Sequence, residues 1–256
     1  MLQDIFLNLD FNILLFLVFA AFVAGFIDAI AGGGGMITIP ALLLSGIPPI
    51  EALATNKLQS SFGSFSATYQ FYKKGYIPLK AAAPYAILAF IFSSLGTILV
   101  QFVDNSLLNK FLPFLILIFG IYFLFAPKIT QDLQEKRRNL AALTLSLAAI
   151  SFYDGFFGPG TGSFFMLSLL LFGAFNLTQS LGQAKLYNFS TNLASLVFFA
   201  LGGHILFSIG LLMAVGQFIG ANLGARAAIS YGKKIIKPLV VGISFIMAAK
   251  LLYEQF

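Results

Sequence analysis

Two lysines and two aspartates are the side chains of this sequence best suited to chemistry within apolar surroundings. Lys57 and Lys185 lie inside long apolar segments, and Asp28 and Asp154 each stand just before a glycine-rich stretch. An ionisable residue in a membrane segment costs at least about 2.5 kcal/mol to insert, so it usually faces a cavity or a partner. The alternative for each lysine is that its flexible stem carries the amine to the membrane interface.

The two glycine-rich stretches have the composition of breaks between helices. Residues 32–35 read GGGG and residues 158–162 read GPGTG, and a short apolar run follows each. A helix that begins there presents unpaired backbone amides and about half a positive charge, which suits an anion. Nucleotide loops are disfavoured because no Gly-Lys-Ser/Thr follows the first stretch and no βαβ unit surrounds the second. Tight turns or close helix packing remain the competing explanation.

We therefore predict one anion site built from both breaks and from polar residues near the lysines. Asp28 and Asp154 have two open roles: ion pairing or helix capping, or accepting protons that couple transport. The residues predicted to bind the substrate are Gly32, Gly33, Gly34, Gly35, Asn56, Lys57, Gln59, Gly158, Gly160, Thr161, Lys185 and Asn188.

The composition is that of an integral membrane protein. Of the 256 residues 59% are apolar and 9% are charged, whereas soluble domains carry about 25% charged residues. At about 20 residues per crossing the length allows roughly eight to ten hydrophobic segments. The chain has no cysteine and one histidine, His204. Disulfides and zinc sites built from cysteine or histidine are excluded, and no metal or cofactor is expected.

Two of the predicted segments are too short to cross a bilayer. Residues 36–45 extend about 15 Å as a helix, about half of a hydrocarbon core. The run 139–153 extends about 22 Å, which places Asp154 at depth. Re-entrant broken-helix hairpins are the natural interpretation. The predicted segments are 12–31, 36–45, 52–72, 79–103, 111–127, 140–157, 161–172, 181–202, 205–229 and 235–253.

The two halves resemble each other at their rare charged residues. FIDAIAGGGG aligns with FYDGFFGPGT at an offset of 126, and NKLQS aligns with AKLYN at an offset of 128. We infer a duplication: 1–127 is the first transmembrane repeat, 128–139 a charged cytoplasmic linker and 140–256 the second repeat. Each repeat is an all-α unit with one broken-helix hairpin and three transmembrane helices. The odd number of crossings inverts the second repeat, as in many transporters.

The basic residues cluster in three loops, 73–80, 128–138 and 233–237, which hold ten of the 15 positive charges. The positive-inside rule places all three on the cytoplasmic face, so both termini are external and no nucleic acid is needed to explain the charge. The spacing of Gly216, Gly220 and Gly224 predicts a close helix contact.

Several of these stretches resemble the sulfite exporter TauE/SafE family, also called TSUP, over essentially the whole chain. They are FIDAIAGGGGMITIPALL, ATNKLQ, FYDGFFGPGTGSF and AKLYN. The resemblance implies a bacterial inner-membrane protein with two inverted repeats that moves small sulfur-containing anions such as sulfite, sulfonates or sulfoacetate. Ala184 stands where the first repeat has Asn56, so the half-sites are not equivalent.

The first functional hypothesis is a secondary transporter of a small anion. The alternative is a proton- or cation-coupled carrier that uses Asp28 and Asp154, with the lysines as counter-ions. A membrane enzyme is not expected because the sequence offers little catalytic machinery. The expected partners are membrane lipid and the anionic substrate, with a homodimer left open and no nucleic acid.

The predicted topology can be tested with single cysteines, since the chain has none of its own. In intact cells, a membrane-impermeant maleimide should label Gln255→Cys and leave Gln134→Cys unlabelled, because the 128–139 linker is predicted to be cytoplasmic. Labelling of Gln134→Cys with protection of Gln255→Cys would overturn the arrangement.

Overall fold

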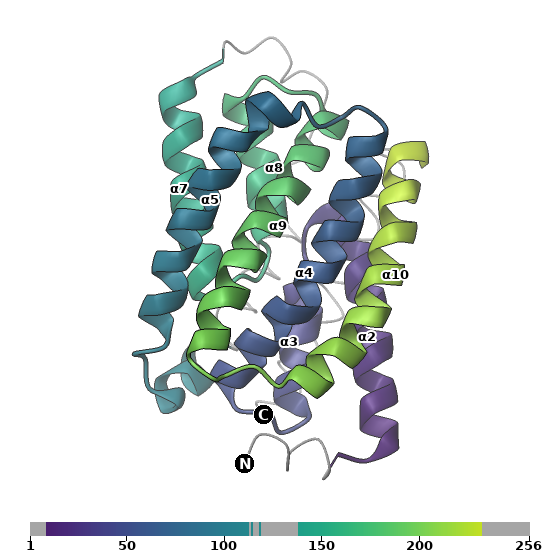
Figure 1. The fold of residues 1–256 in the computed structure, drawn as a ribbon, viewed down its shortest axis with the longest axis vertical. Coiled ribbons are helices and arrows are strands. Elements are labelled where there is room, and N and C mark those ends of the chain that lie inside the picture. The colour runs from purple at the N-terminus through teal and green to yellow at the C-terminus, as the bar shows by residue number, and fades with distance from the viewer. Residues whose placement is uncertain (1–8, 113, 115–117, 119–137, 232–256) are drawn as a thin grey trace.

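The computed structural model describes residues 9–112, 114, 118 and 138–231, and all regular structure among them is α-helical. The helices form an elongated bundle (Figure 1). A further short stretch, 105–112, is also helical. The main helices are α2 (Phe11–Ala31), α3 (Gly35–Leu44), α4 (Pro49–Lys73), α5 (Leu79–Val100), α7 (Leu140–Phe156), α8 (Thr161–Phe172), α9 (Leu177–Leu201) and α10 (Phe207–Tyr231).

The predicted broken helices are present as the pairs α2–α3 and α7–α8. Helix α3 has ten residues and α8 has twelve, so each rises only about 15–18 Å. Figure 1 shows that the α2–α3 hairpin enters from the lower end of the bundle and the α7–α8 hairpin from the upper end. Their breaks therefore approach each other towards the middle of the protein.

Each half of the chain packs its hairpin against the other half. Helix α2 packs on α10, and α7 packs on α5. Likewise α4 packs on α10, α9 packs on α5, and α4 and α9 contact each other in the centre. This set of contacts is unchanged when the two halves are exchanged, which supports the duplication hypothesis.

The interface between α10 and α2 depends on the predicted glycine stripe. A Cβ added to Gly216, Gly220 or Gly224 would lie 2.4, 2.0 or 2.2 Å from a main-chain oxygen of α2. No side chain fits between the two helices at these points, so the predicted close contact is confirmed. Gly96 gives α5 the same kind of contact with α7, where its Cβ would lie 2.1 Å from the Phe152 carbonyl oxygen.

The most apolar helices expose large apolar side chains, whereas the polar helices bury most of their polar side chains. Helices α2, α5 and α10 are long and apolar enough to cross a membrane, and large apolar side chains such as Ile91 and Ile219 are exposed on them. Helices α4 and α9 have 25 residues each and many polar side chains, most of them buried. Because these polar side chains are buried within the protein, they find partners away from lipid.

Helices α4 and α9 begin earlier than the hydropathy pattern predicts, at Pro49 and Leu177 instead of residues 52 and 181. Pro49 is at the first helical position, where a missing N–H costs nothing. Asn176 caps α9 by accepting from the Gln179 amide at 2.9 Å in a capping box. Because Asn176 and Gln179 are polar, the hydropathy pattern leaves the first turn of α9 out of the predicted segment.

The described flanks of the three basic loops share one end of the bundle. Helices α4 and α10 end there, and α5 and α7 begin there (Figure 1). This supports a common face for the three loops. Four kinds of residue lie outside the described ones: most of the predicted segment 111–127, all of segment 235–253, most of the linker 128–139 and the outermost residues of both termini.

The α2–α10 contact predicts strong destabilisation by Gly220→Val, because the new side chain would meet a main-chain oxygen that cannot rotate away. Overpacking of this kind costs about 1–3 kcal/mol. The matched control is Ile219→Val, which places the same residue on the exposed neighbouring position of α10. Thermal unfolding in detergent should show a lower melting temperature for Gly220→Val alone; equal melting temperatures would contradict the close contact.

Candidate functional site

The two helix breaks touch each other through their backbones. Gly32 ends α2 in the left-handed region with φ of +85°, and its amide donates to the Asp28 carbonyl at 2.7 Å. Gly158, its counterpart, has φ of +94°. A Cβ on Gly32 would lie 2.3 Å from the carbonyl carbon of Gly162, and the Ser163 amide donates to the Gly32 carbonyl at 3.3 Å. Glycine is therefore needed at Gly32 for both its φ and the close approach.

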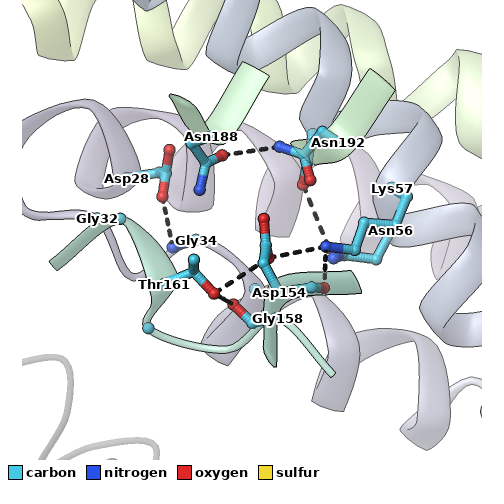
Figure 2. A pocket seen from close by; sticks show the side chains of 14 residues that line it. Asp28, Gly32, Gly34, Asn56, Lys57, Asp154, Gly158, Thr161, Asn188 and Asn192 are labelled. Atoms are coloured by element: carbon cyan, nitrogen blue, oxygen red, sulfur yellow. Dashed lines mark hydrogen bonds and ion pairs between the residues drawn. The ribbon is translucent and has the colours of Figure 1, made fainter. Parts of the chain in front are cut away.

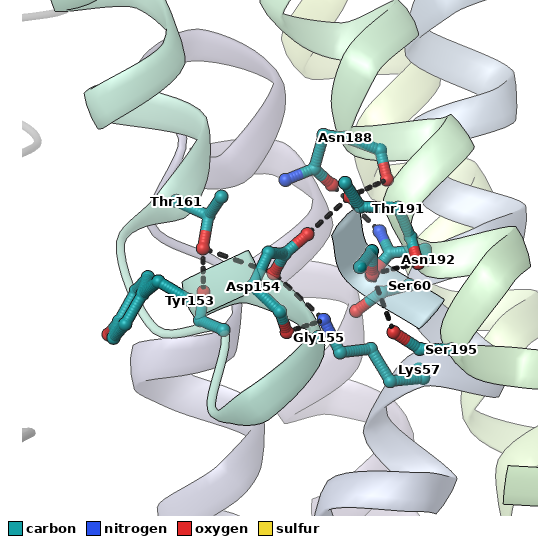
Figure 3. Close-up of polar contacts among 12 residues, drawn as sticks. Lys57, Ser60, Tyr153, Asp154, Gly155, Thr161, Asn188, Thr191, Asn192 and Ser195 are labelled. Carbon is teal, nitrogen blue, oxygen red and sulfur yellow. Dashed lines mark hydrogen bonds and ion pairs between the residues drawn. The ribbon is translucent and has the colours of Figure 1, made fainter. Parts of the chain in front are cut away.

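Two ion pairs cross between the halves at this point. The Lys57 ammonium lies 2.8 Å from Asp154 Oδ1 and 2.5 Å from the Asp154 main-chain oxygen (Figures 2 and 3). The Lys185 ammonium lies 2.8 Å from Asp28 Oδ2 and also donates to the Asp28 main-chain oxygen. Each lysine thus binds the C-terminal turn of the other half's broken helix, where the helix dipole favours a cation.

Neither lysine carries its amine to an interface. Their side chains are 2% and 0% exposed, and both ammonium groups are used in the crossed pairs. The sequence left two roles open for Asp28 and Asp154, a structural one and proton coupling. The structure shows both aspartates in ion pairs, which is the structural role. A buried pair adds little net stability, but removing one partner costs about 3–5 kcal/mol because the other charge stays buried.

A small cavity lies where the breaks and the central helices meet (Figure 2). Its volume is about 20 Å³, room for about one water molecule. The predicted residues in its wall are Gly32, Gly34, Gly35, Asn56, Lys57, Gly158, Gly160, Thr161 and Asn188, together with Asp28 and Asp154. Ser60, Gly162 and Asn192 also line the cavity, although they are not among the residues predicted to bind the substrate.

Three predicted residues do not line the cavity. Gln59 lies behind it and donates to Asn56 Oδ1 at 2.8 Å. Lys185 is completely buried, while its partner Asp28 forms part of the wall. Gly33 faces away, where a Cβ would meet only the sulfur of Met36 at 3.8 Å.

Two of the polar side-chain groups left over in the wall are hydrogen-bond donors. Asn56 Oδ1 accepts from Thr38 Oγ1 at 2.5 Å and from Gln59. Asn188 Oδ1 accepts from Asn192 Nδ2 at 2.7 Å. The amide NH₂ groups of Asn56 and Asn188 have no acceptor among the described residues, and both side chains are more than nine-tenths buried. Since the two lysines and two aspartates balance in charge, these donors favour an anionic or strongly accepting ligand.

The breaks differ in backbone conformation at one matched position. Gly160 has φ of +80°, whereas Gly34 has a helical φ of −56°. A Cβ on Gly34 would lie 2.9 Å from the Asp28 Cβ, so packing, and not a positive φ, explains glycine there. The Gly34 amide donates to Asp28 Oδ1 at 3.2 Å.

With this geometry in view, comparison with known proteins gives the family. The model of the sulfite exporter TauE/SafE family matches residues 17–251. The chain belongs to the TauE/SafE family.

Curated relatives of this TauE/SafE protein carry names that agree with the fold. A probable membrane transporter protein of Haemophilus influenzae is 46% identical over 252 residues, which cover 97% of this chain and 98% of the relative. Another, from a Sinorhizobium species, is 46% identical and covers 96% and 95%. The probable membrane transporter protein YfcA of Escherichia coli is 43% identical and covers 93% and 89%. No solved structure matches the chain. This TauE/SafE protein is a membrane transporter and not an enzyme.

A double-mutant cycle tests the crossed pairing. Lys57→Met and Asp154→Leu should each lower the free energy of unfolding by about 3–5 kcal/mol, because each leaves a buried charge alone. The double variant should be destabilised by at least about 1 kcal/mol less than the sum. Chemical unfolding in detergent measures all three.

The matched control for this cycle combines Lys57→Met with Asp28→Leu, which removes residues from different pairs. That combination should be at least additive, since it leaves both Asp154 and Lys185 without partners. Recovery of stability in the control but not in the partner pair would show that the lysines are paired differently.

Proposed function

We propose that this TauE/SafE protein is a secondary transporter of a small anion, namely a sulfur-containing oxyanion or organosulfonate of the sulfite, sulfonate or sulfoacetate type. The observation that carries the proposal is that the NH₂ groups of Asn56 and Asn188 are buried in the cavity wall without an acceptor in the described part of the chain, next to two ion pairs that balance in charge. An oxyanion offers several acceptor oxygens and satisfies converging donors. The family's description, which names sulfite export, supports the same substrate class.

The position of the cavity supports alternating access. It lies where the two broken-helix hairpins meet, and broken helices around a central site are typical of secondary transporters. In alternating access the two hairpins would separate towards each side of the membrane in turn. No ATP-binding motif occurs in the sequence, and an ion gradient or a partner protein is the proposed energy source.

We infer further that the halves are inverted repeats in the bacterial inner membrane, with the basic loops cytoplasmic and the termini periplasmic. The opposite entry of the two hairpins, the exchangeable helix contacts and the matched charged residues support this. Contact with membrane lipid follows from the exposed apolar side chains of α5 and α10. We also propose a homodimer as the first oligomeric state to test.

The second candidate is a proton- or cation-coupled carrier in which Asp28 and Asp154 bind the coupling ion and the lysines are counter-ions. The observation that favours it is that both carboxylates line the cavity. The two candidates differ in the sign of the charge that the cavity selects.

Asn188→Asp separates the candidates, because it changes a donor into an acceptor with almost no change of shape. Sulfite affinity should fall at least tenfold, which corresponds to about 1.4 kcal/mol. The control is Asn176→Asp, the same exchange on the same helix about 18 Å away, at an N-cap where aspartate is equally favourable.

The readout is sulfite binding to purified protein and sulfite flux in proteoliposomes. Wild-type sulfite affinity in Asn188→Asp would contradict the anion site, and stronger binding of a cation by that variant would favour the carrier that uses the aspartates.

A further inference from the structure

The two crossed aspartates are held very unequally. Asp154 accepts from Lys57, from Thr161 Oγ1 at 3.0 Å and from Thr191 Oγ1, so both of its carboxylate oxygens are bonded to side chains (Figure 3). Its side chain is 3% exposed. Within the described part of the chain, the Asp28 carboxylate accepts only from Lys185 and from the Gly34 amide at 3.2 Å, and its side chain is 13% exposed.

The sequence explains this difference when the two halves are aligned. At the offset of 126, the position of Thr161 is Gly35 in the first half, and at the offset of 128 the position of Thr191 is Gly63. Both hydroxyl donors of the second half are therefore glycines in the first. Above Gly63 the space is filled by α10 instead, where a Cβ would lie 2.5 Å from Gln217 Cγ. Among the described residues, no hydroxyl group takes the place of the missing partners of Asp28.

Asp28 also separates Lys185 from the cavity. The carboxylate of Asp28 lines the cavity, whereas Lys185 is fully buried and contributes nothing to the wall. In the other pair both Lys57 and Asp154 line the cavity. An anion in the cavity therefore meets Lys57 directly but meets Lys185 only after the Asp28 carboxylate has moved.

The donors that hold Asp28 are the donors an oxyanion needs. They are an ammonium group and a backbone amide at the N-terminus of α3, which together favour negative charge. Helices α3 and α8 contain no ionisable side chain in their ranges. Once Asp28 turns away, no residue of these two helices can replace it as counter-ion to Lys185, whereas a bound anion can.

We propose that the Asp28 carboxylate is a tethered substitute for the transported anion and competes with it for Lys185 and the Gly34 amide. This inference rests on the proposed anion transport and assigns a different role to each of the two ion pairs. Lys57–Asp154 is the fixed anchor that joins the halves. Lys185–Asp28 is the exchangeable pair, and Lys185 is the lysine that binds substrate.

The test compares Asp28→Asn with its matched partner Asp154→Asn, with sulfite and methanesulfonate as probes and sodium chloride at equal ionic strength as reference. Removal of the competing carboxylate should tighten sulfite binding at least tenfold in Asp28→Asn. Asp154→Asn should give no tightening and should lower thermal stability, because it disturbs the anchor. Calorimetric titration of the purified proteins measures the affinities.

The outcomes separate this inference from the proposed function. Sulfite binding by the wild type with equal or weaker binding by Asp28→Asn overturns the competition by Asp28 and leaves anion transport standing. No binding of either probe by the wild type and both variants overturns the proposed function, and with it the inference.

Asp28→Asn leaves Lys185 without a counter-charge and could reduce folded yield. In that case the folded yield with and without sulfite is the measurement, because bound sulfite should replace the missing partner of Lys185. Purification in sulfite should then restore monodisperse protein for Asp28→Asn but not for Asp154→Asn, and sodium chloride should restore neither. Failure of sulfite to raise the yield of Asp28→Asn above that in sodium chloride contradicts the proposal.

Discussion

A buried ammonium group must find a negative partner, and in this protein each partner is supplied by the opposite half of the chain. The ammonium groups of Lys57 and Lys185 lie 2.8 Å from carboxylates at the ends of α7 and α2. For both pairs to form, the two helix breaks must come together in the middle of the bundle. That approach leaves no space for side chains, so Gly32 meets Gly162 backbone to backbone. The cavity, the glycines and the central position of α4 and α9 all follow from this pairing.

The two halves arrange their helices in the same way but differ in what surrounds the carboxylates. Hydroxyl groups fix Asp154 on both oxygens, whereas glycines at the matched positions leave Asp28 with a backbone amide and one lysine. An ion pair whose carboxylate has further hydrogen bonds on both oxygens is suited to joining the two halves of the chain. A pair with few other bonds is suited to exchanging its partner. The same kind of lysine–aspartate pair can thus serve as a fixed contact in one place and as a ligand-responsive contact in another.

The sequence predicted the broken helices and most of the cavity wall because charged and glycine residues are rare in apolar segments and their repetition is informative. It did not predict that the pairs cross, since alignment of Lys57 with Lys185 identifies equivalent positions and not partners. The burial of Lys185 behind Asp28 and the helical φ of Gly34 depend on packing between distant segments. Ser60 and Asn192 were accessible to sequence reasoning, because each lies four residues after Asn56 or Asn188 on one helix face.

The crossed pairs also constrain how the protein is made. Synthesis delivers the first half to the membrane before α7 and α9 exist, so Asp154 and Lys185 are absent while α2 and α4 insert. During that interval Lys57 and Asp28 lack the partners they have in the finished protein, and each unpaired charge in the bilayer costs several kcal/mol. Until the second half has been synthesised, the Lys57 and Asp28 side chains therefore need contact with water or with each other. The burial of these charges therefore depends on both halves, because each half contains charges whose partners lie in the other.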